Sequence, residues 1–232
     1  MTLTLLRWIP AALAAAGLTA CGHAAGAAPE TTPRPVAGDA AASSAARVRA
    51  DSLRRPYTEA DVRFMSDMIG HHAQALVMAG WAPSHGANPS VRTLAARIIN
   101  AQQDEIATMQ QWLGDRGQPA PGAHAMDMSH PAHDAGHAMP MPGMLMPGML
   151  TEAQMQALDQ ATGPGFDRLF LKDMIQHHRG AVTMVQQLFD TPGAARDETV
   201  FKFANDVNAD QSTEIARMET MLAALTSEGS SP

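Results

Sequence analysis

This chain of 232 residues has one cysteine (Cys21), few basic residues, and no apolar run long enough to cross a membrane as a permanent helix. With a single cysteine, no disulfide can form within the chain, so the fold cannot depend on one. The chain has 16 basic against 23 acidic residues and a net charge of −7 with neutral histidine. This balance argues against nucleic acid and against electrostatic binding to anionic lipid, and it suits a soluble domain that attracts cations.

The first 20 residues have the pattern of an export signal peptide. Arg7 precedes a mostly apolar run over residues 8–18, which is too short to span a bilayer permanently. The segment ends on Leu-Thr-Ala-Cys at residues 18–21, which resembles the lipobox of bacterial lipoproteins. That resemblance implies a signal peptide at 1–20, cleaved before a diacylated Cys21, and two acyl chains anchor a protein stably. An ordinary cleaved signal with an incidental cysteine is the alternative.

Residues 21–55 are rich in Ala, Pro, Thr, Ser and Gly, and we predict a flexible spacer between the lipid anchor and the folded body. Gly22 stands where an Asp often marks inner-membrane retention, so we expect a periplasm-facing envelope protein, with the outer membrane favoured over the inner. The remaining residues, 56–226, can bury one substantial core, which predicts one domain.

That domain contains an internal repeat. Residues 64–79 return 106 positions later as residues 170–185, and eight of the sixteen positions are identical, including two adjacent histidines. An internal repeat predicts that the fold contains the same unit twice. The identical residues are Phe64, Asp67, Met68, Ile69, His71, His72, Ala75 and Met78, with Phe170, Asp173, Met174, Ile175, His177, His178, Ala181 and Met184 as their counterparts.

Each copy predicts two amphipathic helices joined by a loop, with repeat one at 57–114 and repeat two at 151–226. Thr58 with Asp61 forms a capping signal, and Ser90 is expected to cap the second helix, which Gly114 ends. In repeat two, a short helix from Thr151 precedes a helix over about 166–188 and a final helix. Two such αα-hairpins are expected to pack as an all-α four-helix bundle. The second helices carry matching faces: Gln102, Glu105, Ile106, Met109 and Leu113, then Gln211, Glu214, Ile215, Met218 and Leu222.

The doubled core, Phe-Met-x-x-Met-Ile-x-His-His and Phe-Leu-x-x-Met-Ile-x-His-His, is followed in each copy by Gln-x-x-Glu-Ile-x-x-Met. These motifs resemble a ferritin-like family of domains of unknown function that includes the periplasmic copper-binding protein CopM. The resemblance covers about residues 57–222 and implies an exported ferritin-like bundle that binds copper and contributes to metal tolerance. Met65 departs from the repeat, because Leu171 is its counterpart.

Helix geometry limits which side chains can share an ion. Residues four apart, such as Met68 with His72, lie about 6 Å along the axis and about 40° around it, so their side chains can converge. Met78 lies about 10 Å from His71 along the same helix, which is too far for easy joint coordination. A metal site therefore needs ligands from a second helix. The predicted bundle ligands are Met68, His71, His72, Met174, His177 and His178, supported from a second layer by Asp67, Asp173, Glu105 and Glu214.

Thioether and imidazole together suit Cu(I), a soft ion. A di-iron site would instead need a Glu-x-x-His pair on each of two helices, and Glu105 and Glu214 have no His three residues on. We expect these two glutamates to accept a hydrogen bond from a ring nitrogen and to fix its tautomer. For Met109 and Met218, filling of the core is the preferred interpretation.

The segment between the copies, a loop over about 120–150, is biased in composition. It holds four histidines and seven methionines within 26 residues, among prolines and glycines, and no packed core explains that density. We predict a compliant copper-binding tether. A linker with drifted composition and a surface that docks on a partner protein are the alternatives. The predicted loop ligands are His124, Met126, Met128, His130, His133, His137, Met139, Met141, Met144, Met146 and Met149.

The sequence therefore predicts a lipid-anchored copper-binding protein, preferring Cu(I), for sequestration, buffering or handover, with a copper-handling protein as a possible partner. Two other functions stay open at this stage. One is a ferritin-like metal-dependent oxidase, for which no strong general base or nucleophile is present. The other is an adaptor lipoprotein that uses its methionine-rich loop to bind a partner.

Overall fold

The structure of the protein is a computed structural model that describes residues 47, 50, 56–122 and 145–228. Its helices are α2 (Glu59–Gly80), α3 (Pro89–Asp115), α4 (Glu152–Gln160), α5 (Gly163–Asp190) and α6 (Glu198–Glu228). None of the described residues is in a β-strand. The predictions for Cys21, for the signal, for the spacer apart from residues 47 and 50, and for loop positions 124–144 lie outside the described residues. Residues 47 and 50 are helical.

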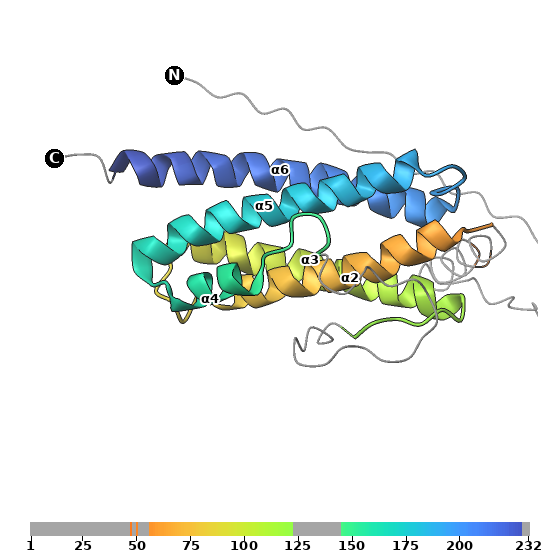
Figure 1. The fold of residues 1–232 in the computed structure, drawn as a ribbon, viewed down its shortest axis with the longest axis horizontal. Coiled ribbons are helices and arrows are strands. Elements are labelled where there is room, and N and C mark those ends of the chain that lie inside the picture. The colour runs from red at the N-terminus through yellow and green to blue at the C-terminus, as the bar shows by residue number, and fades with distance from the viewer. Residues whose placement is uncertain (1–46, 48–49, 51–55, 123–144, 229–232) are drawn as a thin grey trace, which may run out of the picture. The chain divides into compact units, whose positions relative to one another are not determined.

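The four long helices form the bundle that the repeat predicts (Figure 1). In each repeat two consecutive helices pack as a hairpin, α2 with α3 and α5 with α6, and the two hairpins meet along α2 and α5. The short α4 packs against α5 and α2. Among these helices, none is both long enough and apolar enough to cross a membrane.

The first cap agrees with the sequence and the second corrects it. Thr58 and Asp61 form a capping box at the start of α2, as predicted. Ser90, however, is not the cap of α3, because the Asn88 side chain accepts hydrogen bonds from the backbone N–H groups of Ser90 and Val91. Pro89 then occupies the first helical turn, where its missing N–H costs nothing. Asn and Ser are both good caps, so only the position of the backbone distinguishes them.

The start of α5 is a second correction. The sequence predicts a helix from about Phe166, but α5 begins at Gly163 and includes the Gly-Pro-Gly that looked like a break. The first N–H groups of a helix have no partner within it, so proline fits there without loss of a hydrogen bond. The short helix before it starts one residue after Thr151, which forms a capping box with Gln154.

Two equivalent aspartates join the repeats to each other. Buried Asp61, in the first turn of α2, accepts a hydrogen bond of 2.6 Å from the backbone N–H of Ala195 in the second hairpin loop. Its repeat counterpart, Asp167, accepts hydrogen bonds from the backbone and side chain of Asn88 in the first hairpin loop. The start of each of these two helices therefore lies beside the end of the other, so α2 and α5 run antiparallel.

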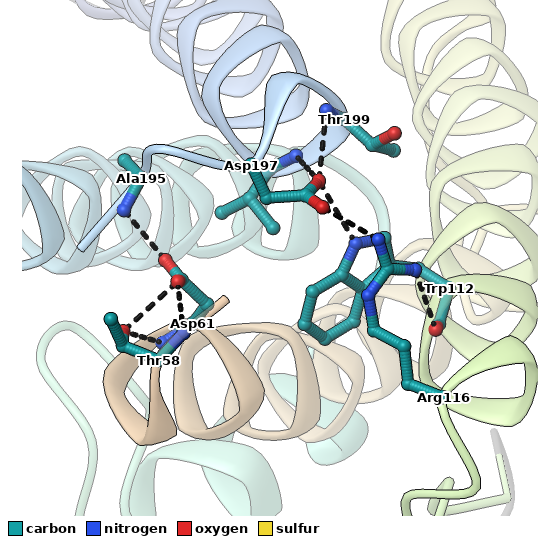
Figure 2. Close-up of polar contacts among 8 residues, drawn as sticks. Thr58, Asp61, Trp112, Arg116, Ala195, Asp197 and Thr199 are labelled. Atoms are coloured by element: carbon teal, nitrogen blue, oxygen red, sulfur yellow. Dashed lines mark hydrogen bonds and ion pairs between the residues drawn. The ribbon is translucent and has the colours of Figure 1, made fainter. Parts of the chain in front are cut away.

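The end of the bundle near Asp61 holds a second polar cluster (Figure 2). Asp197 is fully buried and accepts hydrogen bonds from the Trp112 indole at 3.2 Å, from the Arg116 guanidinium at 2.6 Å and from the backbone N–H of Thr199. The guanidinium also lies over the Trp112 ring, 4.2 Å from its centroid. Because a buried carboxylate needs such partners, this cluster fixes the loop before α6 against α3.

Two apolar clusters fill the bundle. The first combines the early part of α2 with the late part of α5, and includes Phe64, Met68 and Met184. The second combines the late part of α2 with the early part of α5, and includes Met78, Phe170 and Met174. Along α2 and α5 the histidine pairs fall between the two clusters. Burial of each large apolar side chain contributes about 1.5–3 kcal/mol, so the clusters hold the histidines in place.

Candidate metal centre

The two first histidines of the repeat contact each other. His71 of α2 and His177 of α5 have ring centroids 3.9 Å apart and planes inclined by 39°, and both side chains are fully buried. They occupy equivalent positions of the two repeats, so this contact lies where the antiparallel helices α2 and α5 cross. Sequence reasoning predicted both residues as ligands but not that their rings would touch.

The second histidines of the repeat bind the glutamates of the outer helices. His72 Nε2 lies 2.5 Å from Glu105 Oε2 on α3, and His178 Nε2 lies 2.7 Å from Glu214 Oε2 on α6. Both histidines are fully buried, whereas the glutamates reach the surface and are partly exposed. The hydrogen bonds expected between these glutamates and a ring nitrogen are therefore present, one in each repeat.

These hydrogen bonds leave several ring nitrogens without a partner. A carboxylate or carbonyl oxygen can only accept, so the bonded Nε2 of His72 and of His178 carries the hydrogen, as does that of His71, which donates to the Pro147 carbonyl at 3.0 Å. Among the described residues, Nδ1 of all three has no hydrogen-bond partner, and His177 has none at either nitrogen. Buried polar atoms without partners are uncommon in folded proteins and point to a missing partner.

The contacting imidazoles are neutral. Burial lowers the pKa of His71 to about 3, and the neighbouring His72 and His178 add to the decrease, while the Pro147 carbonyl opposes it. Burial also lowers the pKa of His177 well below its ordinary value, with smaller contributions from the imidazoles around it. The His71 backbone opposes this decrease weakly, although it does not reach hydrogen-bonding geometry with either ring nitrogen. Neutral imidazole is the form that binds a metal ion, so both rings are ready to donate a lone pair at neutral pH.

The predicted bundle methionines are buried next to the histidines in sequence, but each belongs to a different apolar cluster. Met68 is in the first cluster with Met184, and Met174 is in the second with Met78. The distance along one helix, used in the sequence analysis, separates Met78 from His71. Because α2 and α5 are antiparallel, Met184 of the second repeat lies in the same apolar cluster as Met68 of the first, and Met78 lies in the same cluster as Met174. The distances along a single helix did not predict this.

The end of the methionine-rich loop lies on the bundle. Met149 is buried, and Met146 is partly buried against the first apolar cluster. Pro147, between them, accepts the hydrogen bond of His71. Sequence reasoning included both methionines among the loop ligands but gave no role to Pro147 or to Gln74, whose side chain bonds the backbone of Leu150.

The predicted supporting aspartates do not bond the histidines. Within the described residues, no hydrogen bond joins Asp67 to His71 or Asp173 to His177. Burial raises the pKa of Asp67 against the opposing charge of Arg63, and it raises the pKa of Asp173 in the same way. Neither aspartate therefore has the hydrogen-bonding role toward histidine that Glu105 and Glu214 have.

Among the described residues, histidines and carboxylates alone do not form a metal site. In residues 56–122 and 145–228, no group of three or more His, Cys, Asp or Glu side chains is placed to hold a metal ion. The histidine cluster offers imidazoles with methionines nearby, and thioether with imidazole is a donor set for soft ions.

The fold and the site define an all-α bundle of two repeated hairpins with paired, buried histidines at its centre. The chain belongs to the family described as Domain of unknown function (DUF305), whose model matches residues 61–222. A DUF305 fragment from Deinococcus radiodurans is 30% identical with a TM-score of 0.59, over 73% of this chain and 99% of that one.

Structures of CopM with bound copper are also similar. The Cu(II)-bound form is 31% identical with a TM-score of 0.53, over 71% of this chain and 96% of that one. The Cu(I)-bound form is 28% identical with a TM-score of 0.51, over 73% and 98%. Uncharacterized protein L153 of Acanthamoeba polyphaga mimivirus is 36% identical over 56 residues, and this match spans 24% of the chain and 37% of the viral protein.

Proposed function

We propose that this protein binds copper, preferring Cu(I), at its central histidines and along its methionine-rich loop, and that it sequesters, buffers or hands over the ion in copper tolerance. The observation that carries this proposal is the ring contact of His71 with His177. Two equivalent, buried and neutral imidazoles meet there with ring nitrogens that no described group satisfies. A fold gains nothing in stability from such nitrogens, because an unsatisfied buried polar group costs about 1–3 kcal/mol.

The chemistry of the donors supports copper over harder ions. Imidazole suits copper, zinc, iron and nickel, but thioether selects soft ions such as Cu(I). Met68 and Met174 are buried three residues before His71 and His177, and Met146 is partly buried directly before Pro147, whose carbonyl bonds the His71 ring. CopM, a similar chain, has structures with bound Cu(I) and with bound Cu(II), which supports copper as the metal, while the preference for Cu(I) rests on the thioethers.

Glu105 and Glu214 complete the site from its outer side. A ligating histidine usually donates its other N–H to a carboxylate or carbonyl, which fixes the tautomer and raises the basicity of the ligating nitrogen. His72 and His178 donate to these glutamates through Nε2, which leaves Nδ1 as the nitrogen available to an ion. His71 donates to the Pro147 carbonyl in the same sense.

The lipobox-like residues 18–21 support a place in the cell envelope, anchored by lipid on Cys21 and facing the periplasm, with the outer membrane favoured. At that place the loop residues from His124 to Met144 would capture ions, and the bundle would hold them. This assignment has its own test: metabolic labelling with a palmitate analogue should mark the wild-type protein and not Cys21→Ser.

The copper proposal is tested by a Cu(I) competition titration against a chromophoric chelator. Three forms are compared: the mature protein, a variant with the loop histidines and methionines at 124–144 changed to Ser, and a variant with His71, His72, His177 and His178 changed to Ala. We expect several Cu(I) ions in the wild type and a loss in each variant. His85→Ala is the control, since His85 is outside the cluster, donates through Nε2 to the Asp159 carbonyl and accepts at Nδ1 from the Ser84 hydroxyl. Copper retention that survives both changes together would contradict the proposal.

A further inference from the structure

The segment Leu145–Leu150 lies across α2 and α5 at the level of the histidine contact, and Figure 1 shows it in green before α4. It is the last part of the methionine-rich loop. Its sequence, Leu-Met-Pro-Gly-Met-Leu, carries two methionines around a Pro-Gly turn, and Gly148 has a φ of 74°. Such a φ favours glycine, so the turn depends on that residue.

Two glutamines hold the backbone of this segment. Gln74 of α2 is buried and bonds Leu150 twice, donating to its carbonyl at 3.1 Å and accepting from its N–H at 2.8 Å. Gln176 of α5 donates to the Gly148 carbonyl at 3.3 Å. His71 itself provides the third attachment through the Pro147 carbonyl. Because the Gln74 side-chain amide bonds both the N–H and the carbonyl of Leu150, it fixes the position of the segment along α2.

A glycine on α5 gives the segment room. A Cβ on Gly180 would lie 1.9 Å from the Pro147 carbonyl oxygen and 2.6 Å from Gly148 Cα. A Cβ on Gly148 would lie 2.5 Å from the Gln176 carbonyl oxygen. The segment and the helix therefore contact each other backbone to backbone, which only glycine permits at these two positions.

The residues that contact this segment stand at two positions where the repeats differ: one repeat has glycine where the other has glutamine. Gly70 and Gln74 flank His71 on α2, and the equivalent positions on α5 are Gln176 and Gly180 around His177. On each helix one of the two positions provides an amide. On α5 the other position, Gly180, leaves space that a Cβ would fill, whereas a Cβ on Gly70 would make only an ordinary contact with Met146. The departure from the repeat thus fits a single segment bound asymmetrically over a symmetric histidine pair.

The segment brings sulfur to that pair. The Met146 methyl carbon lies 3.6 Å from the place a Cβ on Gly70 would take, directly before His71 in the chain. The next residue, Pro147, bonds the His71 ring, and the Met146 side chain packs on the cluster that includes Met68 and Met184. The thioether of Met146 therefore packs against the turn of α2 that carries His71, one residue before the carbonyl that the His71 ring bonds.

We infer that Leu145–Leu150 is a built-in ligand arm: Gln74, Gln176 and Gly180 position it so that Met146 shares one soft monovalent ion with the His71–His177 pair. This inference rests on the proposed copper binding and adds to it which loop methionine joins the bundle site. Met146 is the binding residue of the arm, and the glutamines and glycine are positioning residues.

The test follows Ag(I) binding residue by residue in the full-length mature protein. Ag(I) is a soft monovalent ion that stays in one oxidation state. Methionine methyl groups labelled with ¹³C and histidine rings labelled with ¹⁵N are observed by NMR during the titration, and total bound silver is measured after ultrafiltration. We expect the Met146 methyl and the His71 ring to shift together at the same silver equivalents.

Variants separate the arm from its ligand. Met146→Leu should weaken silver binding at the His71 ring at least tenfold, and Gln74→Leu and Gly180→Ala should weaken it comparably although Met146 is present. Met155→Leu, in a partly buried methionine of α4, is the matched control and should change nothing. Gln74→Leu and Gly180→Ala detach the arm by different changes, so the test remains valid if one of these two variants does not fold.

The possible results are distinct. A His71 ring that responds to silver while the Met146 methyl does not would overturn the arm. So would a folded Gln74→Leu or Gly180→Ala protein with wild-type binding at His71. Silver bound with the His71 ring unchanged would also refute the arm, but it would leave copper binding by the loop intact. No bound silver at all would remove both this inference and the proposed function.

Discussion

His71 and His177 lie ring to ring at the crossing of α2 and α5, with centroids 3.9 Å apart and three of their four ring nitrogens without a hydrogen-bond partner among the described residues. Their chain positions differ by the repeat length, so the contact joins equivalent residues of the two copies. A pair of buried polar rings that the fold leaves unsatisfied lowers stability, and a bound ion would return it.

His177→Leu should therefore stabilise the metal-free protein, by about 1–3 kcal/mol, because both ring nitrogens of His177 lack a partner. Urea unfolding followed by circular dichroism measures this. The same variant should lose most of the stabilisation that Cu(I) gives the wild type. His85→Leu is the control and should destabilise, since both nitrogens of His85 are bonded, Nδ1 by the Ser84 hydroxyl and Nε2 by the Asp159 carbonyl. Equal destabilisation by the two changes would contradict our interpretation of the pair.

The free energy of unfolding of the metal-free protein should decrease as the pH is lowered below about 6.5. The folded pKa of His71 is about 3, below its ordinary value of 6.5, so the unfolded chain binds the proton first. The contribution of this ring is complete above about pH 6.5 and is lost as pH decreases toward 3. At pH 5 the loss from His71 is about 2 kcal/mol. Unfolding free energies of wild type and His71→Gln at pH 7, 6 and 5 test this: the variant should show the shallower decrease, and parallel curves would contradict it.

Glu105→Gln and Glu214→Gln should weaken Cu(I) binding by about 10–100-fold each while the bundle stays folded. Each change replaces the charged carboxylate that accepts the Nε2 hydrogen of His72 or His178 with a neutral amide oxygen, a weaker acceptor, and loss of such a carboxylate partner reduces metal affinity by that order. The measurement is competition with a Cu(I) chelator. Glu219→Gln removes an exposed ion pair with Arg179 and is the matched control, for which we expect no change. Similar losses in all three would show that net charge, not the hydrogen bond, sets the affinity.

Asp61→Ala should destabilise the protein by about 2–4 kcal/mol. The change removes the capping box at Thr58 and leaves the buried N–H of Ala195 without its acceptor. Urea unfolding gives the value, and Asp167→Ala should behave in the same way because it breaks the equivalent bond to Asn88. Glu59→Ala, an exposed acidic residue in the same first turn, is the control. An effect of Asp61→Ala no larger than that of Glu59→Ala would contradict the joining role of this carboxylate.

Much of the fold is predictable from the repeat and its periodicity. The double His-His core, the apolar stripe through Phe64 and Phe170, and the Thr58 cap are local signals, and local signals determine where helices form. The errors at Ser90 and Phe166 are also local. Two adjacent residues that cap equally well, or a Gly-Pro-Gly that the first turn of a helix tolerates, cannot be resolved by sequence preference alone.

The site depends on relations that periodicity does not contain. The ring contact of His71 with His177 requires the axial offset and rotation of two packed helices. The bonds of His72 and His178 to glutamates were predictable, because each pair recurs at matching positions of both repeats. The docking of Leu150 on Gln74 was not, since it joins residues 76 positions apart. The exchange of Gly70 and Gln74 for Gln176 and Gly180 was the available signal, and it was visible only as a lack of identity.

The most direct test of the central claim is anomalous diffraction at the copper absorption edge from crystals of the protein loaded with Cu(I). Our account predicts an anomalous peak at the crossing of α2 and α5, within coordination distance of His71 and His177, and no such peak in a His71→Ala, His177→Ala double variant. Copper peaks confined to the surface, with the two rings still in contact and unoccupied, would contradict it.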